Sequence, residues 1–162
     1  MILIEKIGSN NIVDLALAKS YIKVENSDDD TVIQLLTDSA LEMIEDFLGF
    51  DLFAKKYIQY NREELIIPIE RMYVDEIISV KDKNGTEIDY QVHGEWNAEV
   101  TLIVSVHQDV YTTFTTKNPI IQNVFKTAIL MQVAHMYENR GDTNITPEVA
   151  QLLAGKKMNL WL

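Results

Sequence analysis

The apolar positions in the first fifty residues recur with the period of an α-helix. Asp14 is a residue type that caps helices, and the apolar residues after it lie three or four positions apart. After the acidic run 28–30, a longer stretch places its apolar residues on one predicted stripe: Val32, Ile33, Leu36, Ala40, Met43, Ile44 and Phe47. Gly49 stands where a left-handed terminating residue is favoured. We therefore predict a short helix from residue 15 and a long one that ends near residue 48.

From about residue 56 to residue 116 the hydrophobic period changes to two, and β-branched and aromatic residues become frequent. This pattern predicts strands. Residues 65–69 are apolar but contain Pro68, which has no N–H for a strand ladder, so we predict a strand end or a sheet edge there.

Two hairpins are predicted inside this zone. The Asn84-Gly85 pair lies between two strand-like runs, and Asn-Gly accepts the positive φ angles of a type I′ turn. Residues 100–106 and 110–116 are predicted to form a second antiparallel pair. So few strands form a small sheet that must pack against the helices to be stable.

Helical periodicity returns from residue 118. Asn118 followed by Pro119 is a capping residue followed by proline at the first helical position, and Thr146 with Pro147 repeats that signature before a short final helix. Residues 128–136 place apolar groups almost all round the helix, which is typical of a helix buried on several sides, inside the fold or against another subunit.

The predicted fold class is α+β, mainly α: a helical core of about four helices with an inserted small antiparallel β region. The core covers residues 11–50 and 118–155, and the insertion covers about 56–116. Residues 156–162 are predicted to be a C-terminal tail. Because 162 residues correspond to about one domain of roughly 150 residues, we expect a single domain over residues 1–162.

The charge balance narrows the function classes. The chain has 14 Lys and Arg against 25 Asp and Glu, which gives a formal charge of -11. Because phosphate binding needs clustered cations, this charge argues against a nucleic-acid-binding protein. Cysteine is absent, so a thiolate nucleophile and a Cys-ligated zinc site are excluded. We expect no secretory signal, because the start of the sequence lacks the basic residues, apolar stretch and small-residue cleavage site of one. We expect no membrane span, because polar residues interrupt the most apolar stretch, 120–137.

Few residues form a pattern that is typical of a metal site or a catalytic site. The carboxylates of residues 28–30 could ligate a cation, but their spacing lacks the pattern of a calcium loop, so helix capping is the favoured interpretation. His135 and Glu138 share one helix face and could form half of a metal site, yet a catalytic zinc needs three protein ligands. A hydrogen-bonded core or interface histidine is the favoured interpretation of His135. Arg140 has three candidate partners: Glu138, Asp142 or a carboxylate of a neighbouring subunit.

Enzyme motifs are also missing from the sequence. No Gly-x-Ser-x-Gly elbow, P-loop or dinucleotide fingerprint occurs. We expect no catalytic residue, cofactor or metal, and predict that the protein is not an enzyme. Apolar residues without a place in a helix stripe favour a subunit or partner interface instead, and its candidate residues are Leu41, Met131, His135, Glu138, Arg140 and Trp161.

Four helical segments and two strand entries follow one another in a recognisable order. The helical segments are residues 14–24 (DLALAKSYIKV), 28–36 (DDDTVIQLL), 40–49 (ALEMIEDFLG) and 128–140 (AILMQVAHMYENR), and the strand entries between them are 66–69 (IIPI) and 77–80 (IISV). With these segments the chain resembles the head-tail connector (adaptor) proteins of tailed bacteriophages. The resemblance spans about residues 11–155, with both ends in the family's order.

The resemblance implies a homo-oligomeric ring beneath the portal protein. Such a ring extends the DNA channel, helps to retain packaged DNA and docks the next head-completion or tail protein. It implies a place in the virion neck after assembly and in the host bacterial cytoplasm before it. The negative charge fits a duct through which DNA passes without specific binding. Two alternatives stay open: a small helical interaction or regulatory module without a ring, and a hydrolase that uses His135 and Glu138 with a metal.

Overall fold

The computed structural model describes residues 1–7, 12–94, 100–105, 107–117, 123–140, 142 and 144–156. The chain forms two compact units. The β unit consists of Met1–Ser9 and Gly49–Pro119 and contains the strands, and the helical unit consists of Asn10–Leu48 and Ile120–Leu162 and contains the helices.

The helical unit forms where the sequence predicts helices. Its elements are α1 (Leu15–Ile22), α2 (Asp30–Leu48), α3 (Asn123–Glu138), α4 (Pro147–Leu153) and a short 3₁₀ turn, η1 (Ala154–Lys156). The Asp14 side chain caps α1 by accepting a 2.7 Å hydrogen bond from the Leu17 N–H, which confirms the predicted cap. The predicted Thr146 cap of α4 and the left-handed Gly49 after α2, with φ of 78°, are also confirmed. The predicted Asn118-Pro119 cap lies outside the described residues.

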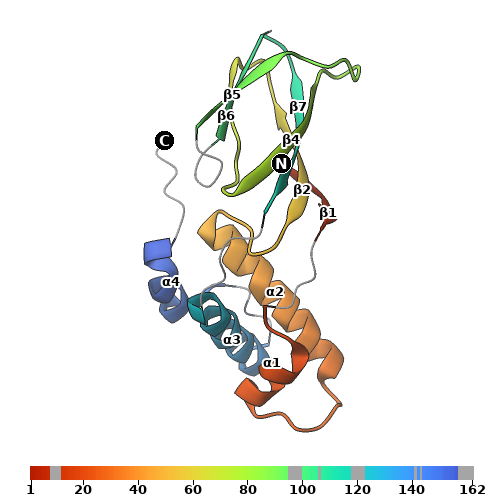
Figure 1. Cartoon of the computed structure of the whole chain (residues 1–162). Coiled ribbons are helices and arrows are strands. Elements are labelled where there is room, and N and C mark those ends of the chain that lie inside the picture. The colour runs from red at the N-terminus through yellow and green to blue at the C-terminus, as the bar shows by residue number, and fades with distance from the viewer. Residues whose placement is uncertain are drawn as a thin grey trace. The chain divides into compact units, whose positions relative to one another are not determined.

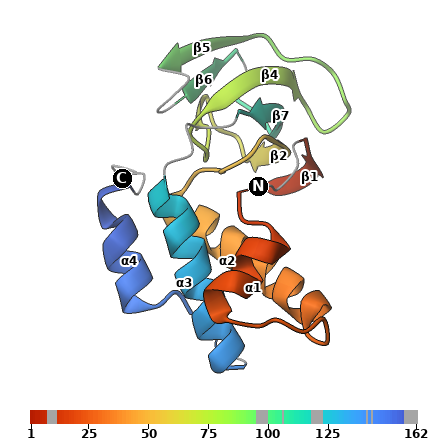
Figure 2. The same cartoon turned by 60° about the horizontal axis from the view of Figure 1, so that its bottom comes forward.

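Helix α3 is the centre of the helical unit. It packs against α2, α1 and α4 (Figure 2). These helices bury a set of apolar side chains. They are Ala18, Ile33, Ala40, Leu41, Ile44, Leu48, Phe125, Ala128, Ile129, Leu130, Val133, Met136, Val149 and Leu153. No helix in the described part of the chain combines the length and the apolar composition of a bilayer span.

The β unit contains two antiparallel sheets in its described residues (Figure 1). The four-stranded sheet has the order β1-β2-β7-β4 and the three-stranded sheet has the order β3-β6-β5. The strands are β1 (Ile2–Lys6), β2 (Lys55–Asn61), β3 (Ile66–Pro68), β4 (Val74–Lys81), β5 (Tyr90–Gly94), β6 (Val100–Val104) and β7 (Val110–Thr116). Pro68 lies in an edge strand, as the missing N–H predicts.

The two sheets of the β unit enclose one apolar core. Alternate residues of β6 and β7 point inward, because successive side chains of a strand lie on opposite faces. Phe114 of β7 is fully buried, and its ring lies 5.6 Å from that of Tyr57 in β2. The remaining core residues come from both sheets: Ile67, Ile69, Val74, Ile77, Val80, Ile88, Val100, Leu102, Val104 and Val110. The β unit is therefore a small sandwich with a core of its own.

The predicted strand pairing is wrong in the β unit. Strand β6 pairs with β3 and β5, whereas β7 pairs with β2 and β4, so the runs 100–106 and 110–116 belong to different sheets. The other predicted hairpin begins with a bridge between Lys81 and Glu87, but its strands then separate. Strand β4 continues along β7, and β5 continues along β6.

The turn of that hairpin also differs from the predicted type I′ geometry. The Gly85 N–H donates to the Asp82 carbonyl at 3.1 Å, which places Lys83 and Asn84 at the centre of the turn. Asn84 is not among the described residues with positive φ, whereas Gly85 has φ of 85°. The left-handed residue thus follows the turn, as in three-residue hairpin loops. The Asp82 carboxylate accepts hydrogen bonds from the Asn84 and Thr86 N–H groups, both at 2.8 Å.

The fold class predicted as mainly α is wrong. The described residues hold four α-helices and seven strands in two antiparallel sheets, so the fold is α+β with a large β component. The prediction fell short because it assigned the strands to one small sheet within residues 56–116. The β unit also takes in Met1–Ser9, whose strand β1 pairs with β2, and the segment from Gly49. That residues 1–162 act as one connector domain stays a prediction.

Candidate functional site

Helix α3 has one side that no other helix of its unit covers completely. Along this side the residues alternate at steps of three and four positions, which places them in one row on the helix surface. Thr127 and Glu138 are exposed, and the other three are half-buried. The row consists of Val124, Thr127, Met131, Ala134 and Glu138, and we call it the α3 face.

Helix α2 carries two apolar stripes where the sequence analysis predicts one. Ile33, Ala40 and Ile44 are fully buried in the unit. The other stripe is turned away from them, and it consists of Val32, Leu35, Leu36, Ser39 and Met43. Val32 is 42% exposed and Leu35 is 65% exposed, while the remaining three are half-buried. We call this row the α2 stripe.

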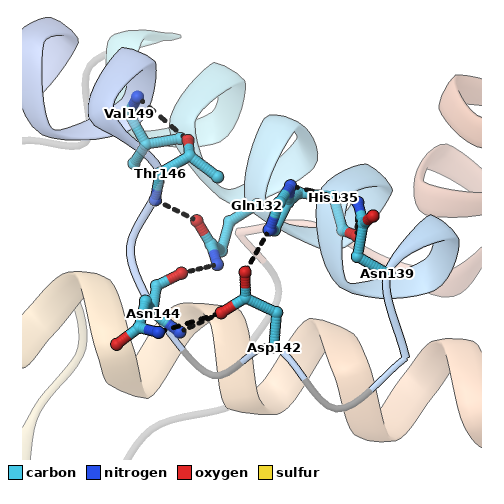
Figure 3. Close-up of polar contacts among 7 residues, drawn as sticks. All are labelled: Gln132, His135, Asn139, Asp142, Asn144, Thr146 and Val149. Carbon is cyan, nitrogen blue, oxygen red and sulfur yellow. Dashed lines mark hydrogen bonds and ion pairs between the residues drawn. The ribbon is translucent and has the colours of Figure 1, made fainter.

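The loop between α3 and α4 is fixed by polar side chains (Figure 3). Gln132 of α3 is fully buried. Its amide nitrogen donates to the Asn144 carbonyl at 2.9 Å, and its amide oxygen accepts from the Thr146 N–H at 3.2 Å. A buried backbone group without a partner costs free energy, so the two bonds of Gln132 help to fix the loop at Asn144 and Thr146.

Asp142 is the second fixed point of this loop. Its carboxylate accepts hydrogen bonds from the Asn144 backbone and side chain at 3.0 and 3.1 Å, and His135 Nε2 lies 3.0 Å from its other oxygen (Figure 3). The hydrogen bond from the Asn144 N–H, followed by that of His135, holds the pKa of Asp142 below its usual range. His135 thus contacts a loop of its own chain, which agrees with the prediction that it is a hydrogen-bonded histidine.

Side chains of α1 and α3 contact the acidic run 28–30 at the start of α2. Tyr137 of α3 donates a 2.6 Å hydrogen bond to Asp29, and Lys19 of α1 forms an ion pair with Asp30 at 2.5 Å. The hydrogen bond to Asp29 is the main cause that raises the pKa of Tyr137. Asp30 also lies in the first turn of α2, where a carboxylate complements the helix dipole.

The structure separates the six predicted interface residues. Met131 and Glu138 lie in the α3 face, His135 lies beside it and contacts Asp142, and Arg140 is exposed just after α3. Leu41 is only 2% exposed, so it lies in the core and presents no surface to a partner. Trp161 lies outside the described residues.

Several surface residues escaped the sequence analysis. The α2 stripe was merged with the buried stripe because Val32 and Ile33 are neighbours in sequence, although adjacent residues point about 100° apart on a helix. Leu35 is not part of the predicted stripe, and no surface role was predicted for it. The signal that separates the two stripes is the spacing: Val32, Leu36, Ser39 and Met43 follow steps of four, three and four.

The β unit holds a buried charged cluster, which we call the Asp51 cluster. Asp51 is fully buried, and its carboxylate accepts hydrogen bonds from Tyr57 at 2.6 Å and from Thr116 at 2.9 Å. Lys55 lies 3.3 Å from the same carboxylate, and Arg71 lies 3.9 Å from it. The cluster joins the segment before β2 to the end of β7, so its evident role is structural.

Metal chemistry finds no support in the described residues. No group of three or more His, Asp or Glu side chains lies together in a way that holds a metal ion in this part of the chain. Glu138 is exposed, and the partner of His135 is the carboxylate of Asp142. The described residues therefore do not complete the half site that His135 and Glu138 could form.

Comparison with known proteins connects the fold to one kind of particle. No family model matches the chain, and no curated protein matches its sequence. Solved structures do match over the whole chain. A chain in the neck of an empty GTA particle computed with C6 symmetry is 13% identical with a TM-score of 0.71, and it covers 100% of this chain and 98% of its own length.

Two further structures show the same likeness. A chain in the virion of a native gene transfer agent (GTA) particle is 13% identical with a TM-score of 0.72, and a chain in the neck of a native GTA particle computed with C12 symmetry is 14% identical with a TM-score of 0.71. Both matches cover 100% of this chain and 98% of the other chain. The chain therefore has the fold of a protein chain found in gene transfer agent particles.

Proposed function

We propose that this chain is a structural subunit of the neck of a phage-like particle. In this role it assembles as a homo-oligomeric ring under the portal protein, extends the DNA channel and docks the next head-completion or tail protein. One observation carries the proposal: the likeness to neck chains covers both chains almost completely, so it includes both the helical unit and the β unit. The sequence resemblance to head-tail connectors points to the same place in the particle.

Ring assembly is supported by the surfaces of the helical unit. The similar neck structures were computed with C6 and C12 symmetry, which are the symmetries of closed rings. A ring needs a heterologous interface, in which two different surfaces of the same subunit meet. The α3 face and the α2 stripe are two such surfaces with apolar residues that their own unit leaves partly exposed.

The charge supports a passive passage for DNA. A formal charge of -11 repels phosphate groups and limits adhesion of DNA in the lumen. The proposal assigns no catalytic step, cofactor or metal to the chain, and its partners are other copies and the neighbouring neck proteins. It places the protein in the virion neck after assembly and in the host cytoplasm before it. Tight binding of the purified protein to duplex DNA at moderate salt would contradict the passive passage.

Sedimentation with the portal ring of the same particle tests the proposed function. We expect the protein to sediment with the portal, and imaging of the complex to show an added ring with rotational symmetry at one end of it. Serum albumin serves as a protein of similar negative charge that should stay in the supernatant. A protein that remains an 18.6 kDa monomer at every concentration and does not bind the portal would refute the proposal.

A further inference from the structure

We infer that neighbouring subunits of the ring meet through the α2 stripe of one copy and the α3 face of the next copy. This inference rests on the proposed function. It specifies which two surfaces of neighbouring subunits meet in the proposed ring. The occupant of each surface is a second copy of this chain.

The composition of α3 shows that its open side is unusual for a solvent-facing surface. The chain has 25 acidic residues, yet between positions 123 and 137 the charged residue is Lys126 alone. The α3 face is free of charge from Val124 to Ala134, which is nearly its whole length. Exposed helix faces in globular proteins carry charged and polar residues, so this face has the composition of one that is covered.

The α2 stripe carries the complementary side chains. Leu35 is 65% exposed and is the most exposed large apolar residue in the described part of the chain, and Val32 beside it is 42% exposed. The α3 face offers small residues in the same kind of row, since Thr127 and Ala134 alternate with the larger Val124 and Met131. Large side chains of one helix fit between the side chains of another when small residues allow the axes to approach to about 8–10 Å.

The spacing of both rows suits such a contact. The α3 face follows steps of three and four residues throughout, and the α2 stripe follows them through Val32, Leu36, Ser39 and Met43. Rows of this spacing interlock when two helices pack at a small angle. About three turns of α2 then lie against about four turns of α3, and the apolar side chains of both rows leave water.

Charge explains why the partner of the α2 stripe is α3 and not a second α2. Asp38, Glu42 and Asp46 follow one another at steps of four along α2, so they form an acidic row next to Leu35. Two α2 helices face to face would oppose these rows. The α3 face has no acidic residue before Glu138. The contact between unlike helices therefore avoids repulsion between subunits that each carry a charge of -11.

Disulfide trapping tests the contact directly, because the natural chain has no cysteine. One preparation carries Leu35→Cys and a second carries Thr127→Cys. After mixing on the portal ring and mild oxidation, we expect a covalent dimer that contains one copy of each variant, and no dimer when either variant is used alone. A chain with both substitutions should give a ladder of covalent oligomers that ends at the closed ring.

Gln34→Cys provides the matched control. Gln34 is exposed and adjacent in sequence to Leu35, but it points to another side of α2. Paired with Thr127→Cys it should give no covalent dimer. A dimer from Leu35→Cys alone would show that α2 pairs with α2, and equal trapping by Gln34→Cys would show that the contact has no specific register. Either result overturns the inference.

Met131→Asp tests the same contact without a covalent bond. Met131 is half-buried at the middle of the α3 face, so the substitution places a charge at the centre of the inferred interface. We expect the variant to keep its circular dichroism spectrum and to lose ring assembly on the portal. The control is Gln151→Asp, which adds the same charge at an exposed position of α4 and should assemble normally.

The outcomes separate this inference from the proposed function. If wild-type rings form on the portal but Leu35→Cys and Thr127→Cys give no mixed dimer, the surfaces are wrong while the neck role stands. If Met131→Asp assembles like the wild type, the inference fails in the same way. If wild-type protein neither binds the portal nor forms a ring, the proposed function itself fails.

Discussion

The two units of this chain differ in what they bury and in how their exposed apolar side chains are arranged. The β unit closes two sheets over a shared core and holds a buried carboxylate, Asp51, among hydrogen-bond donors and cations. The helical unit buries one stripe of α2 and leaves the other stripe partly exposed, together with the α3 face. Both units expose large apolar side chains, such as Ile66 at 62% in the β unit and Leu35 at 65% in the helical unit. In the helical unit the exposed and half-buried ones lie in rows along helices, an arrangement that suits packing against a helix of another copy.

Asp51→Ala is the substitution expected to lower the free energy of unfolding most. The substitution removes the acceptor of the Tyr57 and Thr116 hydroxyl groups and the anion 3.3 Å from Lys55. Removing one partner of a buried ion pair costs about 3–5 kcal/mol, so we expect the free energy of unfolding to fall by about that amount. Urea unfolding followed by tyrosine and tryptophan fluorescence measures it.

Asp75→Ala in β4 is the control for this change. Asp75 is exposed, and its substitution should change the free energy of unfolding by less than about 0.5 kcal/mol. Equal effects of the two substitutions would mean that the Asp51 cluster does not stabilise the β unit.

Gln132→Leu makes the corresponding change in the helical unit. Leucine fills a similar volume but leaves the Asn144 carbonyl and the Thr146 N–H without their partner, at a cost of about 1–3 kcal/mol. We expect a lower melting temperature and faster hydrogen exchange at the Thr146 amide. Gln151→Leu, at an exposed position of α4, should leave both measurements nearly unchanged. Unaltered exchange in Gln132→Leu would show that another contact fixes the loop.

Gly85→Ala tests the turn at which the strands leave for different sheets. Gly85 has φ of 85°, and an added Cβ would find open space, so the cost comes from the backbone conformation alone. A left-handed conformation costs a residue other than glycine about 1–2 kcal/mol. Gly155→Ala, at a position with normal φ and open space, should be neutral in the same thermal unfolding experiment. A neutral Gly85→Ala would imply that the turn relaxes to another conformation.

The helical unit and the β unit also differ in how much of their structure could be predicted from the sequence. Helix ends depend on residues within one turn of each other, and the caps at Asp14 and Thr146 and the stop at Gly49 were therefore predicted correctly. Strand pairing depends on residues far apart in the chain. The predicted pair 100–106 and 110–116 does not form, and the hairpin at Asn84-Gly85 keeps its turn and the Lys81–Glu87 bridge before its strands separate. Burial of a shared core selects the pairing of β4 with β7 and of β5 with β6 instead.

The candidate surfaces were predictable only in part. The all-round apolar character of α3 is visible in the sequence, and it pointed to Met131. Leu41 was chosen because it lies off the expected stripe, but α1 and α3 cover more than one side of α2, and Leu41 is buried at 2% exposure. The width of a buried face depends on how many neighbours a helix has, and periodicity within one helix does not contain that information.

The smallest expected effect concerns pH and Asp142. Its pKa is lowered, chiefly by the Asn144 N–H, so its carboxylate stabilises the folded loop fully above the ordinary pKa near 3.8, and this contribution is lost as the pH falls through the lower folded value. Asp142→Asn removes that titration. We expect its melting temperature to fall slightly at neutral pH and to approach the wild-type value in acid.

Comparison of Asp142→Asn with His135→Gln separates the two contacts of this loop. Glutamine at position 135 keeps a donor toward Asp142, so we expect this variant to retain both ring assembly and the wild-type stability more closely than Asp142→Asn does. Melting curves measured between neutral and acidic pH check both expectations. A loss of ring assembly in His135→Gln with an unchanged melting temperature would instead place the imidazole itself in a subunit contact, and the open side of α3 would then extend beyond the α3 face to His135.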